Sequence, residues 1–387
     1  MQPINIGLIG YKFMGKAHSQ AYKKVGMFFD LPMRPVMKAL CGRDEAGVKE
    51  AAAKFGWESH ETSWQALLER DDIHVVDITA PSNTHREIVE AAAKAGKHIF
   101  CEKPLALNLE DAVAMWRAAE SAGIKHMIGF NYRRTPAVQL AKRLIDEGAI
   151  GEIRHFRGAY LQDFIVDPNF PLVWRLERDV AGSGPLGDLA SHLIDLAHFL
   201  VGDIKEVVGM EKTFIKERPI PTSMIGLSAT SAGGEVGEVT VEDATGFMFQ
   251  FDNGALGNIE ASRMCPGRKN YKTFEIYGSE GALTFSFERM NELEFFSRND
   301  ASYAQGFRTI QVTEPEHAYM DAWWPPGHVI GYDQTFIHEV KDFIEAIAAD
   351  ELPLPNFADG VKCQAVVDSV IESAQTRRWV EVPKVSL

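Results

Sequence analysis

The feature that most constrains the fold is a glycine turn between an apolar run and a helix near the N-terminus. Residues 4–9 read INIGLI, a short run typical of a buried parallel strand. The turn from Gly10 to Gly15 reads GYKFMG, so it has the first and third glycines of the dinucleotide fingerprint G-x-G-x-x-G but Lys12 at the second. Lys12 either points away or adds its ammonium to the phosphates. Taken alone, this turn is a weak signal.

The alternation of strands and helices continues through the first third of the chain. Further strand-like runs lie at 36–41, 75–78, 98–101 and 125–129. Helix signals separate them, and Asn108 and Thr135-Pro136 have the residue types of helix starts. This order predicts an α/β fold with a doubly wound parallel sheet, so we expect residues 1–130 to be a Rossmann dinucleotide-binding domain.

After residue 151 the composition shifts toward β-branched and aromatic runs. These runs lie at 153–161, 246–251, 255–261, 273–277 and 282–287. Turn signals such as Asp252-Asn253-Gly254 separate them. We therefore expect residues 131–387 to form an α+β substrate domain with a large, mostly antiparallel open sheet, whose C-terminal helices could pack back on the first domain.

Composition and charge exclude several classes of protein. The 387 residues, 45% of them hydrophobic, exceed one ordinary domain. The net charge of −14 argues against nucleic acid and against an anionic membrane surface as partners. The four cysteines have no C-x-x-C spacing, which favours buried thiols in a reducing compartment. With no leader-like or membrane-spanning segment, the sequence predicts a cytoplasmic protein.

The strand at 98–101 ends on a charged turn, Glu102-Lys103-Pro104. Strand ends are where open parallel sheets bind their ligands, so a lysine held there beside a stiff proline can act on substrate and cofactor. We therefore expect Glu102 and Lys103 to line the cofactor groove. A tight turn at this place also makes the Lys103–Pro104 peptide bond a candidate for cis geometry.

Other cofactor-binding residues are expected at neighbouring strand ends and loops. The prediction comprises Gly10, Lys12, Phe13, Met14, Gly42, Arg43, Thr79, Asn83, His85, Trp174 and Arg175. For Asn83 an ordinary helix cap explains the residue equally well, and Trp174 could instead be a packing anchor.

The choice between NAD and NADP rests on the end of the second strand. NAD-selective sheets place an acidic residue there, but the sequence reads Cys41-Gly42-Arg43, with Asp44 expected inside the next helix. Arg43 could pair with a 2′-phosphate. From the residues, NADP should be accepted and could be preferred.

A second group of chemical residues lies between 187 and 198, in the segment GDLASHLIDLAH. On a helix, Asp188, His192 and Asp195 would share one stripe. A histidine near a carboxylate can serve as a general base, whereas a buried histidine with a capping aspartate explains the pattern equally well. We assign His198 to packing. No ligand spacing indicates a metal site.

Three features carry a family resemblance: the glycine turn at 10–15, the turn Glu102-Lys103-Pro104, and Asp188 four residues before His192. At these separations they resemble the glucose-fructose oxidoreductase and inositol dehydrogenase (Gfo/Idh/MocA) family, and the resemblance covers nearly the whole chain. Within it, four segments are most similar to levoglucosan dehydrogenases: NYRRTPAV at 131–138, YLQD at 160–163, AGSGPLGD at 181–188 and FEIYGSEGAL at 274–283. The resemblance implies a pyridine nucleotide on the first domain and points to NAD. It also implies a homo-oligomer, dimer or tetramer, through the second domain's sheet.

The resemblance further implies catalytic roles for Lys103, Asp188 and His192. In this mechanism His192 takes a hydroxyl proton, Lys103 stabilises the alkoxide and hydride leaves for the nicotinamide. The expected substrate residues are Lys103, Tyr132, Arg133, Asp163, Asp188 and His192. The expected reaction is reversible oxidation of a ring secondary hydroxyl, at C3 of a pyranose, glycoside or anhydrosugar. Inositol dehydrogenase and an NAD-dependent glycosidase remain alternatives, and a ligand-sensing regulator is disfavoured.

Overall fold

The computed structural model describes residues 1–221, 223–225, 228–230 and 234–386. These residues form two compact units. Unit 1 comprises Met1–Asn131 and Gly331–Gln364, together with the end of the chain from Val385. Unit 2 comprises the described residues of Tyr132–Ile330 and Ala365–Lys384.

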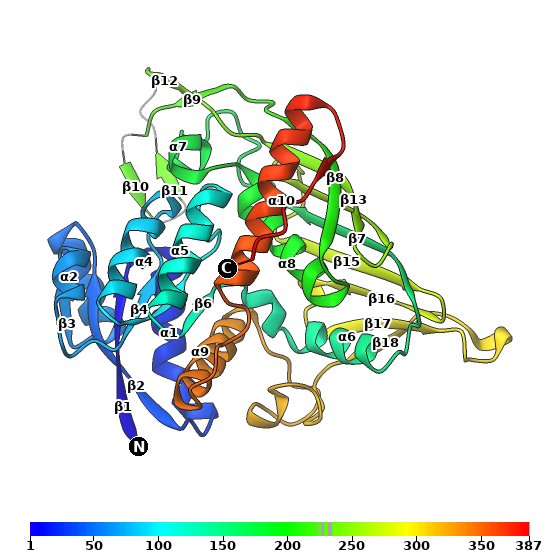
Figure 1. The fold of residues 1–387 in the computed structure, drawn as a ribbon, viewed down its shortest axis with the longest axis horizontal. Coiled ribbons are helices and arrows are strands. Elements are labelled where there is room, and N and C mark those ends of the chain that lie inside the picture. The colour runs from blue at the N-terminus through cyan, green and yellow to red at the C-terminus, as the bar shows by residue number, and fades with distance from the viewer. Residues whose placement is uncertain (222, 226–227, 231–233, 387) are drawn as a thin grey trace. The chain divides into compact units, whose positions relative to one another are not determined.

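Unit 1 contains the predicted parallel sheet. Its six strands lie in the order β3-β2-β1-β4-β5-β6, and every neighbouring pair is parallel. Figure 1 labels β1, β2, β3, β4 and β6 of this sheet. The strands are β1 (Gln2–Ile9), β2 (Met33–Cys41), β3 (Ser59–Glu61), β4 (Val75–Ile78), β5 (His98–Cys101) and β6 (His126–Ile128). The strand order reverses between β1 and β4, and this is where open sheets of this kind bind ligands.

The helices of unit 1 lie between these strands and after the last of them. They are α1 (Phe13–Phe28), α2 (Glu45–Phe55), α3 (Trp64–Leu68), α4 (His85–Lys94), α5 (Leu109–Ser121), α9 (Tyr332–Ala348) and the first part of α10 (Phe357–Thr376). Asn108 caps α5, because its side chain accepts a 2.8 Å hydrogen bond from the Asp111 N–H. Helix α9 packs against α1, although the two are far apart in the sequence.

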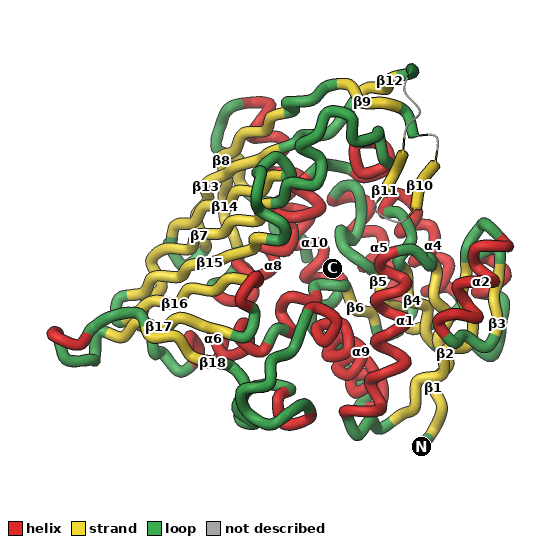
Figure 2. Tube along the Cα trace, turned by 180° about the vertical axis from the view of Figure 1, so that it is seen from behind, coloured by secondary structure: helices red, strands yellow, loops and turns green. Residues whose placement is uncertain are grey.

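Unit 2 is built on a nine-stranded sheet with the order β18-β17-β16-β15-β7-β14-β13-β8-β19. Figure 2 shows these strands side by side from β8 to β18. They are β7 (Ile153–Leu161), β8 (Ile204–Lys212), β13 (Ala244–Phe251), β14 (Leu256–Ser262), β15 (Tyr271–Gly278), β16 (Gly281–Ser286), β17 (Glu292–Ser297), β18 (Arg308–Gln311) and β19 (Val380–Glu381). The sheet is mostly antiparallel, as predicted. The exception is the pair β7–β14, which is parallel, an arrangement that the long connection between these strands allows.

Short elements complete unit 2. They are β9 (Glu217–Pro219) with β12 (Val236–Glu238), β10 (Ser223–Ile225) with β11 (Ser228–Thr230), and the helices α6 (Pro136–Asp146), α7 (Arg178–Ala181) and α8 (Ser191–Leu200). A π-helical turn, Leu186–Ala190, leads directly into α8.

The nine-stranded sheet has one covered face. Helices α6 and α8 contact this face, and Phe156 lies against Phe249 and Phe274 beneath them, with ring centroids 6.3 and 6.4 Å apart. The alternation of buried and exposed residues along β13 puts Met248 on the opposite face. There Met210, Met248 and Leu256 are exposed by 73%, 57% and 52%. This second face therefore presents apolar side chains to the surface.

Candidate functional site

The predicted nucleotide turn joins β1 to α1 where the strand order of the parallel sheet reverses. Gly10 has a φ of 104°, a conformation that L side chains rarely adopt. A Cβ on Gly15 would lie 2.0 Å from the Gly10 carbonyl oxygen, so only glycine fits there. The turn holds α1 close to the strand end, and the free N–H groups of the first helical turn can bind an anion. This cradle fits the pyrophosphate of a dinucleotide.

Lys12, in place of the second fingerprint glycine, is the N-cap residue of α1 and is exposed. Its Nζ lies 4.8 Å from the centroid of the Tyr11 ring, a cation–π distance. The neighbouring Phe13 is 43% exposed, and Met14 is half-buried. Lys12 thus keeps its positive charge at the surface of the turn.

Arg43 and Asp44, which follow β2, carry opposite charges. Arg43 is exposed, as a phosphate ligand must be. Asp44 does not lie inside α2 as predicted; it is the N-cap residue, a position that aspartate favours. Its Oδ2 accepts a 3.4 Å hydrogen bond from the Tyr11 hydroxyl. A Cβ on Gly42 would lie 2.3 Å from the Tyr11 ring, so Gly42 leaves room for this tyrosine.

The segment after β4 forms hydrogen bonds with the end of β1 and with the turn after β5. The Thr79 hydroxyl donates to the Ile9 carbonyl oxygen at 3.0 Å. Asn83 is exposed in a short 3₁₀ turn. His85 is only 1% exposed, and its ring nitrogens lie 3.0 Å from the Ala80 carbonyl oxygen and 3.1 Å from that of Pro104. His85 therefore links the segments after β4 and β5.

The charged turn Glu102-Lys103-Pro104 follows β5 directly. The Lys103–Pro104 peptide bond is cis, which confirms that prediction. Glu102 is 5% exposed, and its Oε2 accepts a 3.1 Å hydrogen bond from the backbone N–H of Lys103. The Lys103 side chain is half-buried.

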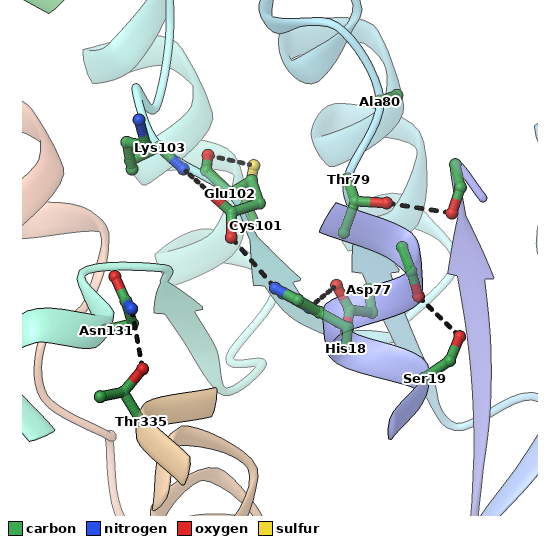
Figure 3. Close-up of polar contacts among 12 residues, drawn as sticks. His18, Ser19, Asp77, Thr79, Ala80, Cys101, Glu102, Lys103, Asn131 and Thr335 are labelled. Carbon is green, nitrogen blue, oxygen red and sulfur yellow. Dashed lines mark hydrogen bonds and ion pairs between the residues drawn. The ribbon is translucent and has the colours of Figure 1, made fainter. Parts of the chain in front are cut away.

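The sequence interpretation missed two buried residues beside this turn, His18 in α1 and Asp77 in β4 (Figure 3). The Nδ1 atom of His18 lies 2.8 Å from Asp77 Oδ2, and its Nε2 lies 3.0 Å from Glu102 Oε1. One signal was available, because Asp77 interrupts the apolar strand VVDI and a buried carboxylate requires a partner. Its partner in α1 is 59 residues away and could not be identified from spacing.

In unit 2, Asp188 and His192 do not share one α-helix. His192 and Asp195 lie in α8 as predicted, whereas Asp188 lies in the preceding π-helical turn. The prediction of a single α-helical stripe is therefore wrong for Asp188, because a π turn has a different number of residues per turn. The turn is held at its start by Glu242, whose Oε1 accepts a 2.9 Å hydrogen bond from the Leu186 N–H.

Both carboxylates of this segment have arginine partners. Asp188 Oδ2 lies 2.7 Å from Arg263 Nη2, and Arg263 is 1% exposed. Arg133 donates from Nε and Nη2 to Asp195, at 2.9 and 2.6 Å. Arg133 was expected to bind substrate, and its guanidinium is here engaged with a buried carboxylate.

Aromatic rings surround His192, which is 6% exposed. The centroid of the Tyr132 ring lies 4.5 Å from that of His192 in an edge-on arrangement, and the Tyr132 hydroxyl lies 3.0 Å from that of Tyr160. The Nζ of Lys272 lies 2.5 Å from the centroid of the Tyr132 ring. Burial lowers the pKa of Lys272 well below its usual value, against the opposing charge of Asp195. Sequence reasoning did not identify Lys272, which lies on the buried face of β15 with Phe274 and Ile276.

Of the remaining predicted residues of unit 2, Asp163 lies in a loop and Trp174 and Arg175 lie in a 3₁₀ turn. Asp163 Oδ2 accepts hydrogen bonds from Lys269 Nζ at 2.8 Å and from the Gly267 N–H at 3.0 Å, and the bond to Lys269 is the main cause of the lowered pKa of Asp163. The Arg175 guanidinium lies 4.3 Å from the centroid of the Trp174 ring. Thus the residues expected to hold the cofactor lie in unit 1, except Trp174 and Arg175, and the expected base lies in unit 2.

Among the described residues, no group of three or more histidine, cysteine, aspartate and glutamate side chains could hold a metal ion. No helix in the described part of the chain is long and apolar enough to cross a membrane.

Comparison with known proteins gives two family matches along the chain. Residues 4–130 match the oxidoreductase family with an NAD-binding Rossmann fold, and residues 138–284 match the GFO/IDH/MocA C-terminal domain. Levoglucosan dehydrogenase of Pseudarthrobacter phenanthrenivorans is 48% identical over 390 residues, covering 100% of both chains. Inositol 2-dehydrogenase of Rhizobium meliloti is 26% identical and covers 98% of this chain and 99% of its own.

Solved structures give the same relationship. Levoglucosan dehydrogenase in complex with NADH and levoglucosan has a TM-score of 0.94 and 47% identity, with 99% of this chain and 100% of that chain covered. An oxidoreductase domain protein from Kribbella flavida has a TM-score of 0.94 and 49% identity, with the same coverage. The two family matches and these full-length relatives show that the chain belongs to the GFO/IDH/MocA family of NAD-binding oxidoreductases.

Proposed function

We propose that this enzyme uses NAD to oxidise a ring secondary hydroxyl of a pyranose, glycoside or anhydrosugar, at C3, to a keto sugar, and that the reaction is reversible. The observation that carries the proposal is the 48% identity to levoglucosan dehydrogenase over the full length of both chains. Residues 1–130 would bind the nucleotide, and residues 131–387 would bind the sugar.

In the proposed mechanism, His192 takes the hydroxyl proton and Lys103 stabilises the negative charge that develops on the oxygen. Bound NAD would accept the hydride. The residues that would hold NAD are the Gly10–Gly15 turn and the strand-end residues of unit 1. Asp188, paired with Arg263, would accept a hydrogen bond from a neighbouring sugar hydroxyl through its partly exposed carboxylate.

The surroundings of His192 support a sugar as substrate. Aromatic rings beside it suit the C–H faces of a pyranose, and the hydroxyls and carboxylates on the same unit suit its O–H groups. A site with such buried polar groups rejects an analogue that lacks a hydroxyl far more strongly than one that differs by a methylene. We therefore expect activity to collapse when the hydroxyl next to the oxidised carbon is removed.

The test is NADH formation across pyranoses, anhydrosugars and inositols, with NMR identification of the product from the best substrate. A 3-keto sugar is the expected product. A lactone from oxidation at C1, or activity confined to open-chain alcohols, would contradict the C3 assignment. No net NADH formation, with hydrolysis of glycosides instead, would favour a glycosidase.

Inositol is the second candidate substrate, because several relatives are inositol dehydrogenases, among them the enzyme from Rhizobium meliloti. These relatives are far less similar to this chain than levoglucosan dehydrogenase, so a ring sugar is preferred. A kcat/KM for myo-inositol above that for every pyranose and anhydrosugar would reverse the order.

NAD is the expected cofactor, and the loop after β2 is proposed to decide how far NADP is accepted. Asp44, at the N-cap of α2, can accept hydrogen bonds from ribose hydroxyls and would repel a 2′-phosphate. Arg43 would attract that phosphate. Asp44→Asn should lower the KM for NADP and Arg43→Ala should raise it, with smaller changes for NAD. Equal effects on both cofactors would show that this loop does not read the phosphate.

We also propose a homo-oligomer that pairs the open faces of the nine-stranded sheet. Met210 and Met248 are exposed on this face, and their burial against a second copy would remove apolar surface from water. Met248→Glu should shift the mass measured by light scattering toward the monomer. Met27→Glu, at a methionine of α1 that is 75% exposed, is the matched control. An unchanged mass for Met248→Glu would rule out this face.

A further inference from the structure

We infer that His18 is a positioning residue for Lys103: a buried imidazolium, clamped between Asp77 and Glu102, that fixes the turn on which Lys103 stands. The inference rests on the proposed role of Lys103 and extends it. All the residues concerned belong to unit 1 (Figure 3).

The geometry first defines what His18 can do. Both of its ring nitrogens face carboxylate oxygens: Nδ1 lies 2.8 and 3.0 Å from the two Asp77 oxygens, and Nε2 lies 3.0 Å from Glu102 Oε1. An ionised carboxylate only accepts hydrogen bonds, so both contacts require an N–H on the ring. A neutral imidazole has one N–H and a protonated one has two. The arrangement therefore fits the imidazolium.

The surroundings of His18 leave little room for other arrangements. His18, Asp77 and Glu102 are 1%, 0% and 5% exposed. The rings of Phe100 and Phe336 lie 4.9 and 5.6 Å from the imidazole, between centroids. In such apolar surroundings an unpaired charge is costly, so the imidazolium and its carboxylates hold one another in place.

The titratable groups around His18 come from three further elements besides its own. Tyr22, also in α1, donates a 2.9 Å hydrogen bond to Asp77 in β4, and Glu339 of α9 acts on Tyr22 through its charge. Glu102 follows β5. Burial by itself would lower the pKa of His18, but the charges and hydrogen bonds of Asp77 and Glu102 outweigh burial and raise that pKa well above the usual value.

The Glu102 carboxylate connects the His18 ring to the backbone of Lys103. One carboxylate oxygen meets the imidazole, and the other accepts the 3.1 Å hydrogen bond from the Lys103 backbone N–H. Gly129 leaves the space that this carboxylate needs, since a Cβ there would lie 3.0 Å from Oε1 of Glu102. On the far side of Lys103, His85 contacts the carbonyl oxygens of Pro104 and Leu105 at 3.1 and 3.2 Å. The turn is thus held before and after Lys103 by buried histidines.

The consequence for catalysis is geometric. A displacement of about 1 Å at a reacting group can cost roughly 100-fold in rate. Without His18, the buried Glu102 carboxylate would lose its charged partner and would have to move or take up a proton. Either change alters the hydrogen bond that holds the Lys103 backbone. His18 therefore affects turnover through Lys103 without a contact to substrate.

The experiment compares His18→Gln with the matched control His126→Gln, using NAD and levoglucosan. His126 is also a buried histidine of unit 1 that contacts a glutamate, Glu120 at 3.2 Å, but it lies at the start of β6, away from the turn. We expect His18→Gln to lower kcat roughly 10- to 100-fold. His126→Gln should change kcat by less than about twofold, and neither should change the KM for NAD by more than about twofold.

A readout other than activity tests the charge itself. In ¹⁵N-histidine NMR spectra of the protein, the His18 signals, assigned by their loss in His18→Gln, should show two protonated nitrogens at about pH 7.5, where an ordinary histidine is neutral. Glu102→Gln, which retains the size of the side chain, is the second variant if His18→Gln fails to fold. It should lower kcat as well and bring the His18 titration toward its ordinary range.

Three results would overturn the inference: a neutral His18 at this pH, a kcat for His18→Gln or Glu102→Gln within about twofold of wild type, or an equal loss in His126→Gln. Lys103→Ala, measured in parallel, separates this inference from the proposed function. If Lys103→Ala remains active, the proposed function fails. If Lys103→Ala is inactive while His18→Gln keeps full activity, only the role of His18 fails.

Discussion

The two units handle buried charge in different ways. In unit 1, two carboxylates share one imidazole, since Asp77 and Glu102 both contact His18. In unit 2, each of the two carboxylates near His192 has a guanidinium of its own, Asp188 with Arg263 and Asp195 with Arg133. Arginine stays protonated at every relevant pH, whereas a histidine can lose its proton. The difference teaches that the carboxylates near the proposed base have partners of fixed charge, while the carboxylates beside the turn of Lys103 share a partner that can titrate.

The largest effect is expected from removing Lys103 or His192, and it tests whether both units contribute to one reaction. Lys103→Ala and His192→Ala should each lower kcat by about 10²- to 10⁴-fold, because each removes a group proposed to act at the reacting oxygen. The circular dichroism spectrum should stay close to wild type. NAD binding, followed by fluorescence, should be unchanged in His192→Ala and retained in Lys103→Ala with a smaller loss than that in kcat. Near-normal kcat in either purified variant would contradict its role.

The next prediction tests the arginine–carboxylate pairs of unit 2. Asp195→Ala should lower the free energy of unfolding by about 3–5 kcal/mol, since it leaves the buried Arg133 guanidinium without its carboxylate. Urea denaturation measures the change. Replacing both residues, with Arg133→Met and Asp195→Leu, should restore much of the loss. A cost below about 1 kcal/mol for Asp195→Ala would place the pair among ordinary surface ion pairs.

Lys272 tests what a buried charge without a hydrogen-bond partner costs in the same unit. Its ammonium has no hydrogen-bond partner among the described residues and lies against the Tyr132 ring. Because folding lowers the pKa of Lys272, the unfolded chain binds the proton more tightly and stability falls as pH drops below the ordinary lysine range. Lys272→Met should therefore raise stability near neutral pH by about 1–3 kcal/mol, with a smaller gain in alkali. A loss at neutral pH, measured by urea denaturation, would show that the ammonium stabilises the fold.

The smallest effect concerns Glu211 of β8, a second group of unit 2 with a shifted pKa. Burial and the nearby charge of Glu242 raise the pKa of Glu211 from 4.5 to about 7. The folded protein then binds this proton more tightly than the unfolded chain, so stability declines as pH rises from about 4.5 to about 7. Glu211→Gln should raise the melting temperature above pH 7 and lose this advantage below about pH 4.5. A gain that is independent of pH would contradict the shifted titration.

The sequence predicted the parts of the site that depend on local patterns. The Gly10 and Gly15 turn, the strand end before Lys103, the cap at Asn108 and the strand at 153–161 all follow from neighbouring residues. It also predicted the sheet classes, because alternating strands and helices allow few arrangements. The mistaken expectations, Asp44 inside α2 and Asp188 on an α-helix, are errors of a few residues at helix starts, where several local geometries compete.

What the sequence alone determined is the family of the chain and the glycine turn of its nucleotide-binding domain. It also led to the proposal of Lys103 and His192 as the acid–base residues. Only the tertiary structure decided which partners the buried charges have. His18 meets Asp77 and Glu102 across 59 and 84 residues, and Arg133 meets Asp195 across 62. No periodicity spans such distances in a chain. The partners are selected by burial, since a charge removed from water must be paired with whatever opposite charge the packing of distant elements brings beside it.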